Sequence, residues 1–599
     1  MKLNINKFML ACGLGASLMS MPSCTLDEVN YGGDTLENLG TGPAGFEQLL
    51  NNCYFGMIRR YYNHEGCMPL MEGSTDLWTV AANERNKDNQ LFKFYGDASP
   101  DVSYTSGFWD CSFDGIGACN MALKTVGTCS FSSEAERRHK EGIARFMRAV
   151  YYYNLVEMFG AVPMLTTVGE VTYSPERTAP VEIYRQLIIP DLEFAAANIY
   201  VGDYSANTTP TRKSALGMLT KACLASRQYT DEFMQRGFEV AKDLIADCEG
   251  GGSRYMTYMY PEYADVFKEE NSHDNKEALW KYWLSAEANN FYGSSNGAQK
   301  LNQNDERFQC KLFRFGAFLK NADFCTAWGG DLEGNMMPTR HLLNLFVQED
   351  GSLDPRFHKS FNTEWISNQD YNWTEGDVNQ YKKDAALTGT TIKSGDLGLR
   401  FVMPQDENYA AEVAGRGTSN YILVDYKDVY DDAKNDIIMD AANGGENMFR
   451  YYYPSLNKHN SSNYYVRNAS KIQLGNMNGI LVMRMAEVYL IAAEYDILLN
   501  GGGRAMEYIN KVRSRAGAKP LTGAATIRTV LDERGRELCG EFTRFYDLKR
   551  TGMLNDASYL QATHPDLAQY FKKEYALRPI PRSFLDVIAN GATFQNPGY

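Results

Sequence analysis

The segment from Leu481 to Gly517 constrains the fold most, because it predicts two antiparallel helices joined by the glycines at 501–503. Gly517 can adopt the left-handed conformation that ends the second helix. A single helix pair cannot bury both of its faces, so this pair must stack on others, as in a helical-repeat scaffold. The first helix carries two stripes at helical spacing, one apolar (Val482, Met485, Tyr489, Ala492) and one mostly polar (Arg484, Glu487, Ile491, Glu494).

The N-terminal third of the chain predicts about three further helix pairs. The predicted helix at Thr211–Gln228 is rich in Ala and other small residues, which suits close helix packing. The predicted helix at Ala135–Phe159 ends before Pro163, which cannot continue a helix. The predicted helices are Phe46–Tyr62, Phe108–Leu123, Ala135–Phe159, Val181–Ile199, Thr211–Gln228 and Phe233–Cys248.

The chain changes character between Gly250 and Gly475, where Gly, Asn, Asp, Tyr and Trp dominate and sustained helical periodicity is rare. Long irregular stretches in a compact protein are usually functional. Asn275–Leu284 predicts a short strand within this region. Asp425–Asp440 is acidic, and we interpret it as a solvated face, with a calcium site as the alternative.

Composition excludes some classes of partner. The net charge is −14 and the isoelectric point is near 5.2, which argues against a nucleic-acid surface, because such a surface needs clustered Lys and Arg. The chain has 39 Tyr; most are expected to be half-buried in helix packing, and some could stack on the apolar faces of sugar rings.

The first residues predict a targeting segment. Lys2 and Lys7 precede a mostly apolar run at 8–21, which is too short to span a membrane. Ser23 and Cys24 follow it and predict a lipoprotein cleavage site with lipid attachment at Cys24. The other cysteines are scattered, which indicates small buried side chains, with a disulfide among Cys111, Cys119 and Cys129 as the alternative.

Sequence blocks in the C-terminal part resemble the SusD/RagB family in their order and spacing: RMAEVYLIAAE, INKVRSRAG, LDERGRELCGEFTRFYDLKR, LRPIP and a terminal QNPGY. The resemblance implies a mainly α fold, a scaffold of tetratricopeptide-like helix pairs with a large irregular, loop-rich ligand-binding subdomain. The expected division is a signal peptide at 1–23, a tether at 24–41, a helical region at 42–249, an irregular ligand-binding region at 250–475 and a helical region at 476–599.

The resemblance also implies a function. We expect a non-catalytic lipoprotein of the outer membrane that faces the exterior and binds oligosaccharide or polysaccharide. It would deliver this glycan to a SusC-like TonB-dependent transporter, with no cofactor. Its expected ligand residues, which match the family's aromatic arc and acidic-plus-Arg loop, are Trp328, Tyr292, Trp78, Tyr104, Asp76 and Arg85; Trp109 matches a scaffold position.

Two alternatives stay open. The ligand could be a peptide or glycopeptide, since some members of the family are tied to peptide import. The chain could instead be a surface glycoside hydrolase or esterase, because 74 acidic residues always offer carboxylate pairs. Gly293–Gly297 fits G-x-S-x-G, but the sequence predicts neither a strand before it nor a helix after it, so we interpret it as a flexible loop. No paired-His zinc spacing, phosphate-binding loop or dinucleotide fingerprint is present in the sequence.

Overall fold

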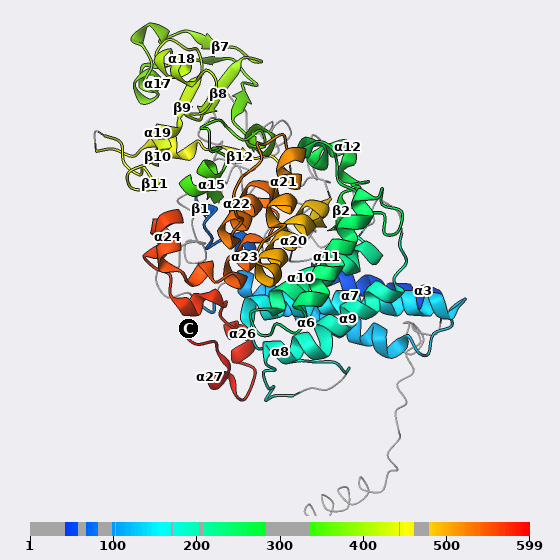
Figure 1. Ribbon diagram of the computed structural model, residues 1–599. Coiled ribbons are helices and arrows are strands. Elements are labelled where there is room, and N and C mark those ends of the chain that lie inside the picture. Colours follow the sequence, from blue (N-terminus) through cyan, green and yellow to red (C-terminus); the bar gives the residue numbers. More distant parts are fainter. Residues whose placement is uncertain are drawn as a thin grey trace, which may run out of the picture.

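The computed structural model of the chain is largely helical, with a smaller region of short strands at one end (Figure 1). It describes residues 42–57, 61, 68–81, 99–101, 103–168, 172–202, 208–282, 336–442, 444–459 and 479–599.

The N-terminal half supplies a row of helices in which each packs on the next. The row contains α3 (Pro43–Gly56), α6 (Ser103–Thr125), α7 (Glu134–Phe159), α9 (Ile189–Asn198), α10 (Arg212–Ser226) and α11 (Met234–Glu249). Local chemistry sets the ends of α7: the Ser133 side chain accepts a hydrogen bond from the backbone of Glu136, and Gly160 adopts φ 73° after the last turn. Helices were predicted in all six of these segments, and the structure confirms them. Trp109 of α6 is buried, as predicted.

The C-terminal half continues the row. α20 (Met485–Asn500) packs on α10 and α11 and forms a pair with α21 (Ala505–Arg515), while α22 (Ile527–Leu538) packs on both helices of the pair. The helix-pair prediction is confirmed, and Gly501 ends α20 with φ 74°. Both ends of the chain therefore build one helical scaffold, as expected for the fold class.

The start of the first C-terminal helix was predicted too early. Residues Ile480–Arg484 form strand β13, which pairs antiparallel with β2 (Ala278–Tyr282). Val482 therefore lies on a strand and not on the apolar stripe of α20. The aliphatic run at 480–483 suits a strand, and a distant partner strand decides the matter. β2 itself confirms the strand predicted at Asn275–Leu284.

Further short elements complete the described residues. The remaining helices are α4 (Met68–Glu72), α8 (Pro180–Ile183), α12 (Glu269–Ser272), α15 (Arg340–Leu345), α16 (Phe357–Ser360), α17 (Glu375–Gln380), α18 (Tyr409–Ala414), α19 (Tyr426–Val429), α23 (Arg544–Arg550), α24 (Ala557–Thr563), α25 (Pro565–Ala568), α26 (Arg582–Leu585) and α27 (Gly591–Phe594). The antiparallel strand pairs are β1 (Trp78–Val80) with β3 (Met336–Pro338), β4 (Phe361–Asn362) with β12 (Ser455–Leu456), β6 (Tyr371–Asn372) with β7 (Thr391–Ile392), and β10 (Tyr430–Asp431) with β11 (Asp436–Ile437). β8 (Leu397–Val402) lies between β5 (Glu364–Ile366) and β9 (Ile422–Asp425) in a three-stranded sheet.

The acidic segment Asp425–Asp440 is only partly a solvated face. Asp425, Tyr426, Val429 and Tyr430 are buried, and the Asp425 carboxylate accepts a hydrogen bond from the backbone of Lys427 and caps α19. Asp432 and Asp440 are exposed. Among the residues that the structure describes, no three His, Cys, Asp or Glu side chains are grouped so that they could hold a metal ion.

A network of buried ion pairs ties the two halves together. Arg484 contacts Glu277 at 3.0 Å, and Glu537 and Glu541 at 2.7 Å each, although its side chain is only 1% exposed. Arg356 reaches Glu537 at 2.9 Å from a third segment. Burial opposes the ionisation of Glu537, yet the surrounding arginines lower its pKa to about 2.

The polar stripe predicted for the first C-terminal helix faces this interior and not solvent, with Arg484 at the end of β13 and the other residues on α20. Arg484, Glu487 and Glu494 are at most 2% exposed, and Glu487 pairs with Arg534 at 2.9 Å. The helix is therefore buried on nearly all sides, and its polar residues are compensated by charges from other segments.

The described cysteines, Cys111, Cys119 and Cys129 included, are free thiols, so the alternative of a disulfide among those three is wrong for this structure. In the part of the chain that the structure describes, no helix combines the length and apolar character needed to cross a bilayer.

Candidate functional site

Asp76 lies just before β1 and is fully buried. Its carboxylate accepts hydrogen bonds from Arg544 Nε at 2.7 Å and Nη2 at 2.6 Å, and from the Tyr559 hydroxyl at 2.6 Å. Burial opposes ionisation of this carboxyl, but the Arg544 guanidinium holds its pKa well below the usual range. Asp76 thus anchors the scaffold. The prediction that it contacts ligand is wrong for this structure, because both oxygens are committed inside the protein.

Trp78 is also buried and shows no exposed surface. It belongs to β1, opposite Pro338 of β3, and its ring centroid lies 6.4 Å from that of Phe361. A ring without exposed surface cannot stack on a sugar that arrives from solvent. The structure therefore contradicts the prediction that Trp78 contacts ligand. The local sequence misled because β1 has only three residues, and its burial depends on the pairing with β3.

Tyr104 lies in the first turn of α6 and not in a loop before it. Its side chain is half-buried against the hydrophobic core. Trp328, Tyr292, Arg85, Cys24 and the Gly293–Gly297 motif lie outside the described residues. The structure thus brings Asp76 and Trp78 into the interior, and it leaves Tyr104 as the described member of the predicted set with partial exposure.

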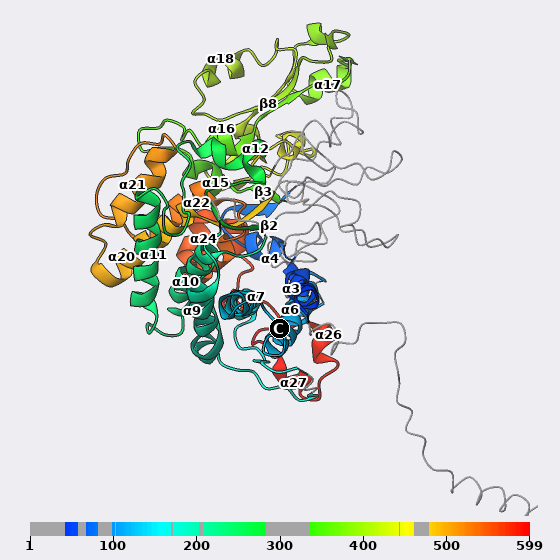
Figure 2. The same ribbon diagram turned by 90° about the vertical axis from the view of Figure 1, so that its right-hand side faces the viewer.

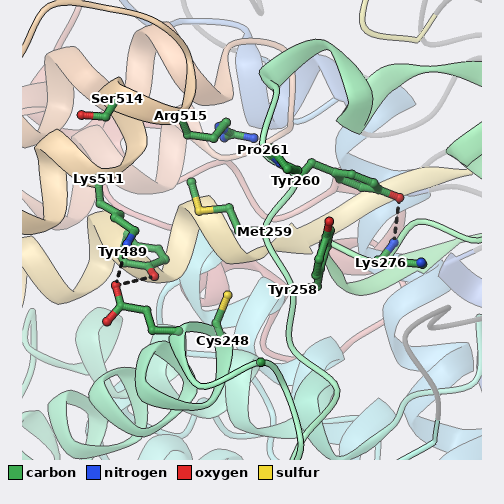
Figure 3. Close-up of a pocket in the computed structure, with 12 residues that line it drawn as sticks. Cys248, Tyr258, Met259, Tyr260, Pro261, Lys276, Tyr489, Lys511, Ser514 and Arg515 are labelled. Atoms are coloured by element: carbon green, nitrogen blue, oxygen red, sulfur yellow. Dashed lines mark hydrogen bonds and ion pairs between the residues drawn. The ribbon is translucent and has the colours of Figure 1, made fainter.

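The described residues contain an open pocket of about 730 Å³ at another place, between the end of α11, residues 251–261 and the α20–α21 pair (Figure 3). This size lies within the ordinary range for small-molecule sites. The pocket is lined by Cys248, Glu249, Gly251, Tyr258, Met259, Tyr260, Pro261, Lys276, Tyr489, Lys511, Ser514 and Arg515.

The turn after α11 builds one wall of the pocket. Gly251 and Gly252 adopt φ 88° and 72°, which side chains with a Cβ rarely allow. The Asp247 carboxylate then accepts hydrogen bonds from the backbone of Arg254 at 2.8 Å and from the Thr257 hydroxyl at 2.6 Å. Because these contacts fix residues 254–257, the chain leaves the helix at a defined angle and presents Tyr258.

Aromatic rings stand on two sides of the pocket. Tyr258 and Tyr260 meet edge to face, with centroids 5.3 Å apart and an interplanar angle of 89°. Figure 3 shows these two rings near Lys276 on one side and Tyr489 of α20 near Lys511 on the other, with Met259 and Cys248 between them. Tyr258 is half-buried, whereas Tyr260 and Tyr489 are buried.

The charged side chains of the pocket differ in whether they form ion pairs with carboxylates of the protein. Arg515 is 5% exposed and pairs with Glu277 at 3.2 Å. Lys511 pairs with Glu249 at 3.0 Å, and the Tyr489 hydroxyl donates to the same carboxylate at 3.2 Å. Lys276 is exposed, and no carboxylate of the described residues lies within ion-pair distance of its ammonium group, which sits 6.0 Å from the Tyr258 ring centroid.

The chemistry of the pocket favours binding over covalent catalysis. Burial raises the pKa of the Cys248 thiol to about 12, with nearby glutamates adding to the effect, so the reactive thiolate is scarce at neutral pH. Burial likewise raises the pKa of Tyr260 and of Tyr489. The pocket thus offers tyrosine rings, the sulfur-containing side chains of Cys248 and Met259, and cations.

No sequence motif predicts a role in binding for these pocket residues, and Tyr489 is expected only on the apolar stripe of its helix. A signal was present in the run YMTYMYPEY at 255–263, which begins three residues after the last of the glycines at 250–252. Tyr258 and Tyr260 are two residues apart, which indicates two rings on the same side of an extended segment. The partners on α20 and α21 come from more than 200 residues away and carry no local signal.

Comparison with known families matches residues 247–599, more than half of the chain, to the SusD family. This chain belongs to the SusD family. Residues 33–224 match a second model of the same group, described as starch-binding associating with outer membrane. The two matches confirm the predicted family and support glycan binding and association with the outer membrane.

SusD-family relatives match at both sequence and structure level. SusD-like protein P2 of Formosa agariphila is 23% identical over 612 residues, 97% of this chain and 98% of that protein. Starch-binding protein SusD of Bacteroides thetaiotaomicron is 34% identical over 126 residues, 20% of this chain and 21% of that one.

Solved structures share the fold. A SusD homologue from Bacteroides thetaiotaomicron superposes with a TM-score of 0.64 at 17% identity, covering 94% of this chain and 97% of that one. A laminarin-binding SusD-like protein superposes with a TM-score of 0.60 at 20% identity, covering 93% of this chain and all of that one. The predicted fold class, a helical scaffold, is confirmed.

Proposed function

We propose that this protein captures glycan chains at the cell surface without cleaving them and passes them to a SusC-like TonB-dependent transporter. Membership of the SusD family is the observation that carries the proposal. A relative of this chain is named for starch binding and a structural neighbour for laminarin binding, which agrees with glycan as the ligand class. Lipid attachment at Cys24 would hold the protein on the outer membrane, facing the exterior.

We further propose that Trp328, Tyr292, Tyr104 and Arg85 contact the glycan. Tyrosine and tryptophan rings can stack on the apolar faces of sugars, while a guanidinium donates to vicinal hydroxyls. Support comes from the described strands that flank these positions in sequence. Arg85 follows β1 in the sequence and Trp328 precedes β3, and Val80 at the end of β1 lies opposite Met336 at the start of β3. The segments that carry Arg85 and Trp328 are therefore attached to the scaffold at neighbouring residues. Tyr292 lies in sequence between β2 and β3.

Binding is tested with the acyl-free chain that begins after Cys24. A panel of neutral glycans, anionic glycans and peptides is titrated calorimetrically. Binding of a glycan supports the proposal, whereas binding of peptides alone would replace it by peptide capture. Reducing ends are measured after long incubation with each glycan that binds. Their appearance at an enzymatic rate would contradict a non-catalytic role.

The contact residues are tested with Trp328→Ala. A stacking indole at a desolvated anchor is worth roughly 1–3 kcal/mol, so the affinity should fall by about 5- to 150-fold without loss of folding. Tyr173→Ala is the matched control, because Tyr173 is 72% exposed and lies just before α8. An unchanged affinity of the Trp328 variant would remove Trp328 from the site.

A further inference from the structure

We propose that the pocket between α11, residues 251–261 and the α20–α21 pair is a second binding site, specific for an anionic oligosaccharide. The inference rests on the proposed function in one respect, namely that the ligand is a saccharide. The shared chemistry of the ligand is a sugar chain that carries carboxylate or sulfate groups.

The pocket continues into a neighbouring hollow. A second space of about 500 Å³ lies between α11 and α21 and shares Glu249, Tyr489 and Lys511 with the first. Glu249 and Lys511, which form an ion pair, and Tyr489, whose hydroxyl donates to Glu249, line both spaces and lie at their common boundary. Both side chains of the pair are about half exposed, at 48% and 54%. Such a pair is weak and exchanges readily with a competing ligand. The two hollows together suit a chain of several sugar units and exceed what one monosaccharide needs.

The rings determine which part of a sugar enters. Tyr258 is half-buried and is held by the edge-to-face contact with Tyr260, whose hydroxyl accepts a hydrogen bond from the backbone of Lys276 at 3.2 Å. A ring that is fixed in this way loses little freedom on binding, which favours stacking against a pyranose face. Met259 and Pro261 extend the apolar wall beside it.

The cations determine the charge of the ligand. The chain as a whole is acidic, with a net charge of −14, so an anion would be repelled from most of its surface. Lys276 nevertheless stands at the Tyr258 ring without a carboxylate partner among the described residues. Lys511 would become available to an anion when its exposed pair with Glu249 opens. Arg515 is committed to Glu277 and Glu537 and stays a wall residue. The arrangement therefore favours a carboxylate or sulfate next to a stacked sugar ring.

The residues of the second site are other residues than the proposed contacts Trp328 and Tyr292. Lys276 lies two residues before β2, whereas the segment with Tyr292 and Trp328 follows the end of that strand. Five residues of strand place its ends about 13 Å apart. In Figure 2, α11, α20 and α21 lie at the left of the molecule and β2 and β3 lie to their right. Each set of residues can therefore be substituted without changing the other.

Calorimetry with three size-matched probes tests the proposal: an oligogalacturonate, a sulfated galactan oligosaccharide and a neutral β-glucan oligosaccharide. At least one anionic probe should bind the wild-type chain, and raising the salt to 0.5 M should weaken that binding. Lys276→Gln should lower the affinity for it by roughly tenfold, because one charge-assisted contact is lost. Tyr258→Ala should lower it by a similar or larger factor, about 10- to 30-fold. Which anionic probe binds identifies the anion.

Lys434→Gln is the matched control, because this lysine is 80% exposed in the strand region and keeps only a 3.7 Å pair with Asp431. It should leave the affinity unchanged. If Tyr258→Ala folds poorly, Lys276→Gln still tests the proposal, because Lys276 is exposed and its substitution should leave folding intact. The proposal is overturned if neither anionic probe binds, or if Lys276→Gln binds as tightly as the wild type. The Trp328→Ala variant should keep the salt-sensitive binding, so failure of the proposed glycan contacts and failure of this second site give different results.

Discussion

Replacing Asp76 by alanine removes the carboxylate that holds Arg544 in the interior. Arg544 is 2% exposed, and Asp76 supplies two of its hydrogen bonds, at 2.7 and 2.6 Å. In the variant the guanidinium keeps Leu531 O, at 2.7 Å from Nη1, and a long contact of 3.4 Å to the Tyr559 hydroxyl. The expected result is a large loss of stability, because a buried cation is left without its counter-charge.

The magnitude follows from these contacts. Each hydrogen bond to a charged group contributes about 1.5–3 kcal/mol, so two lost bonds suggest about 3–6 kcal/mol. Breaking a buried ion pair by removing one partner costs about 3–5 kcal/mol in general, which agrees. Because Arg544 holds the pKa of Asp76 well below its usual range, this contribution is fully present above about pH 4 and fades as the pH falls below it.

Denaturant unfolding followed by circular dichroism measures the effect. The control is Asp101→Ala, which breaks the 2.8 Å surface pair with Arg582 and should cost less than about 1 kcal/mol. Glycan affinity of the folded fraction should equal that of the wild type. Normal stability combined with lost glycan affinity would refute the buried anchor and restore Asp76 as a ligand residue. Arg544→Met should partly rescue Asp76→Ala, since the orphaned charge is then gone.

Two more changes test the packing. Burial raises the pKa of Glu72 to about 8, so the contribution of this carboxyl to stability should be fully present below about pH 4.5 and be lost as the pH rises to 8. Glu72→Gln should flatten this decline and add about 1–3 kcal/mol to the free energy of unfolding at pH 8. A variant whose unfolding profile across that pH range equals that of the wild type would contradict the prediction. Gly237→Ala should lower the free energy of unfolding by about 1–3 kcal/mol, because a Cβ at this position would overlap the Tyr495 hydroxyl where α11 meets α20. The control is Gly117→Ala on the open face of α6, which should be neutral or stabilising by up to about 1 kcal/mol. Equal unfolding midpoints of the two variants would refute the close packing at Gly237.

The helical scaffold was predictable because its signal is local. Apolar periodicity, Ser133 before α7 and glycines after α7 and α20 all act within a few residues of the element that they define. The family could also be identified from the sequence, because the C-terminal blocks follow one another in the order and spacing of the SusD/RagB family. The boundary between β13 and α20 was missed because the strand exists through its partner β2, about 200 residues earlier.

The site was harder to predict, because exposure is a property of the assembled fold. Trp78 and Asp76 sit in a segment with loop composition, yet β3 and α23 cover them from 260 and 468 residues away. A polar or aromatic residue in such a segment therefore says little about solvent contact until its partners are known. The residues at 255–263 show the converse, since a tyrosine-rich run without any family motif lines the open pocket.

Long-range charge pairing explains why the C-terminal blocks are so polar for helices that lie in the core. Glu277 and Arg484 are 207 residues apart, and Glu537 joins them from α22. Each of these charges would be costly to bury alone, so the interior is stable only when the segments from both halves have assembled. Arg515 extends the same network to the wall of the pocket through Glu277. The network that joins the two halves thus also fixes the place where α21 meets residues 251–261, and the shape of the proposed second site depends on it.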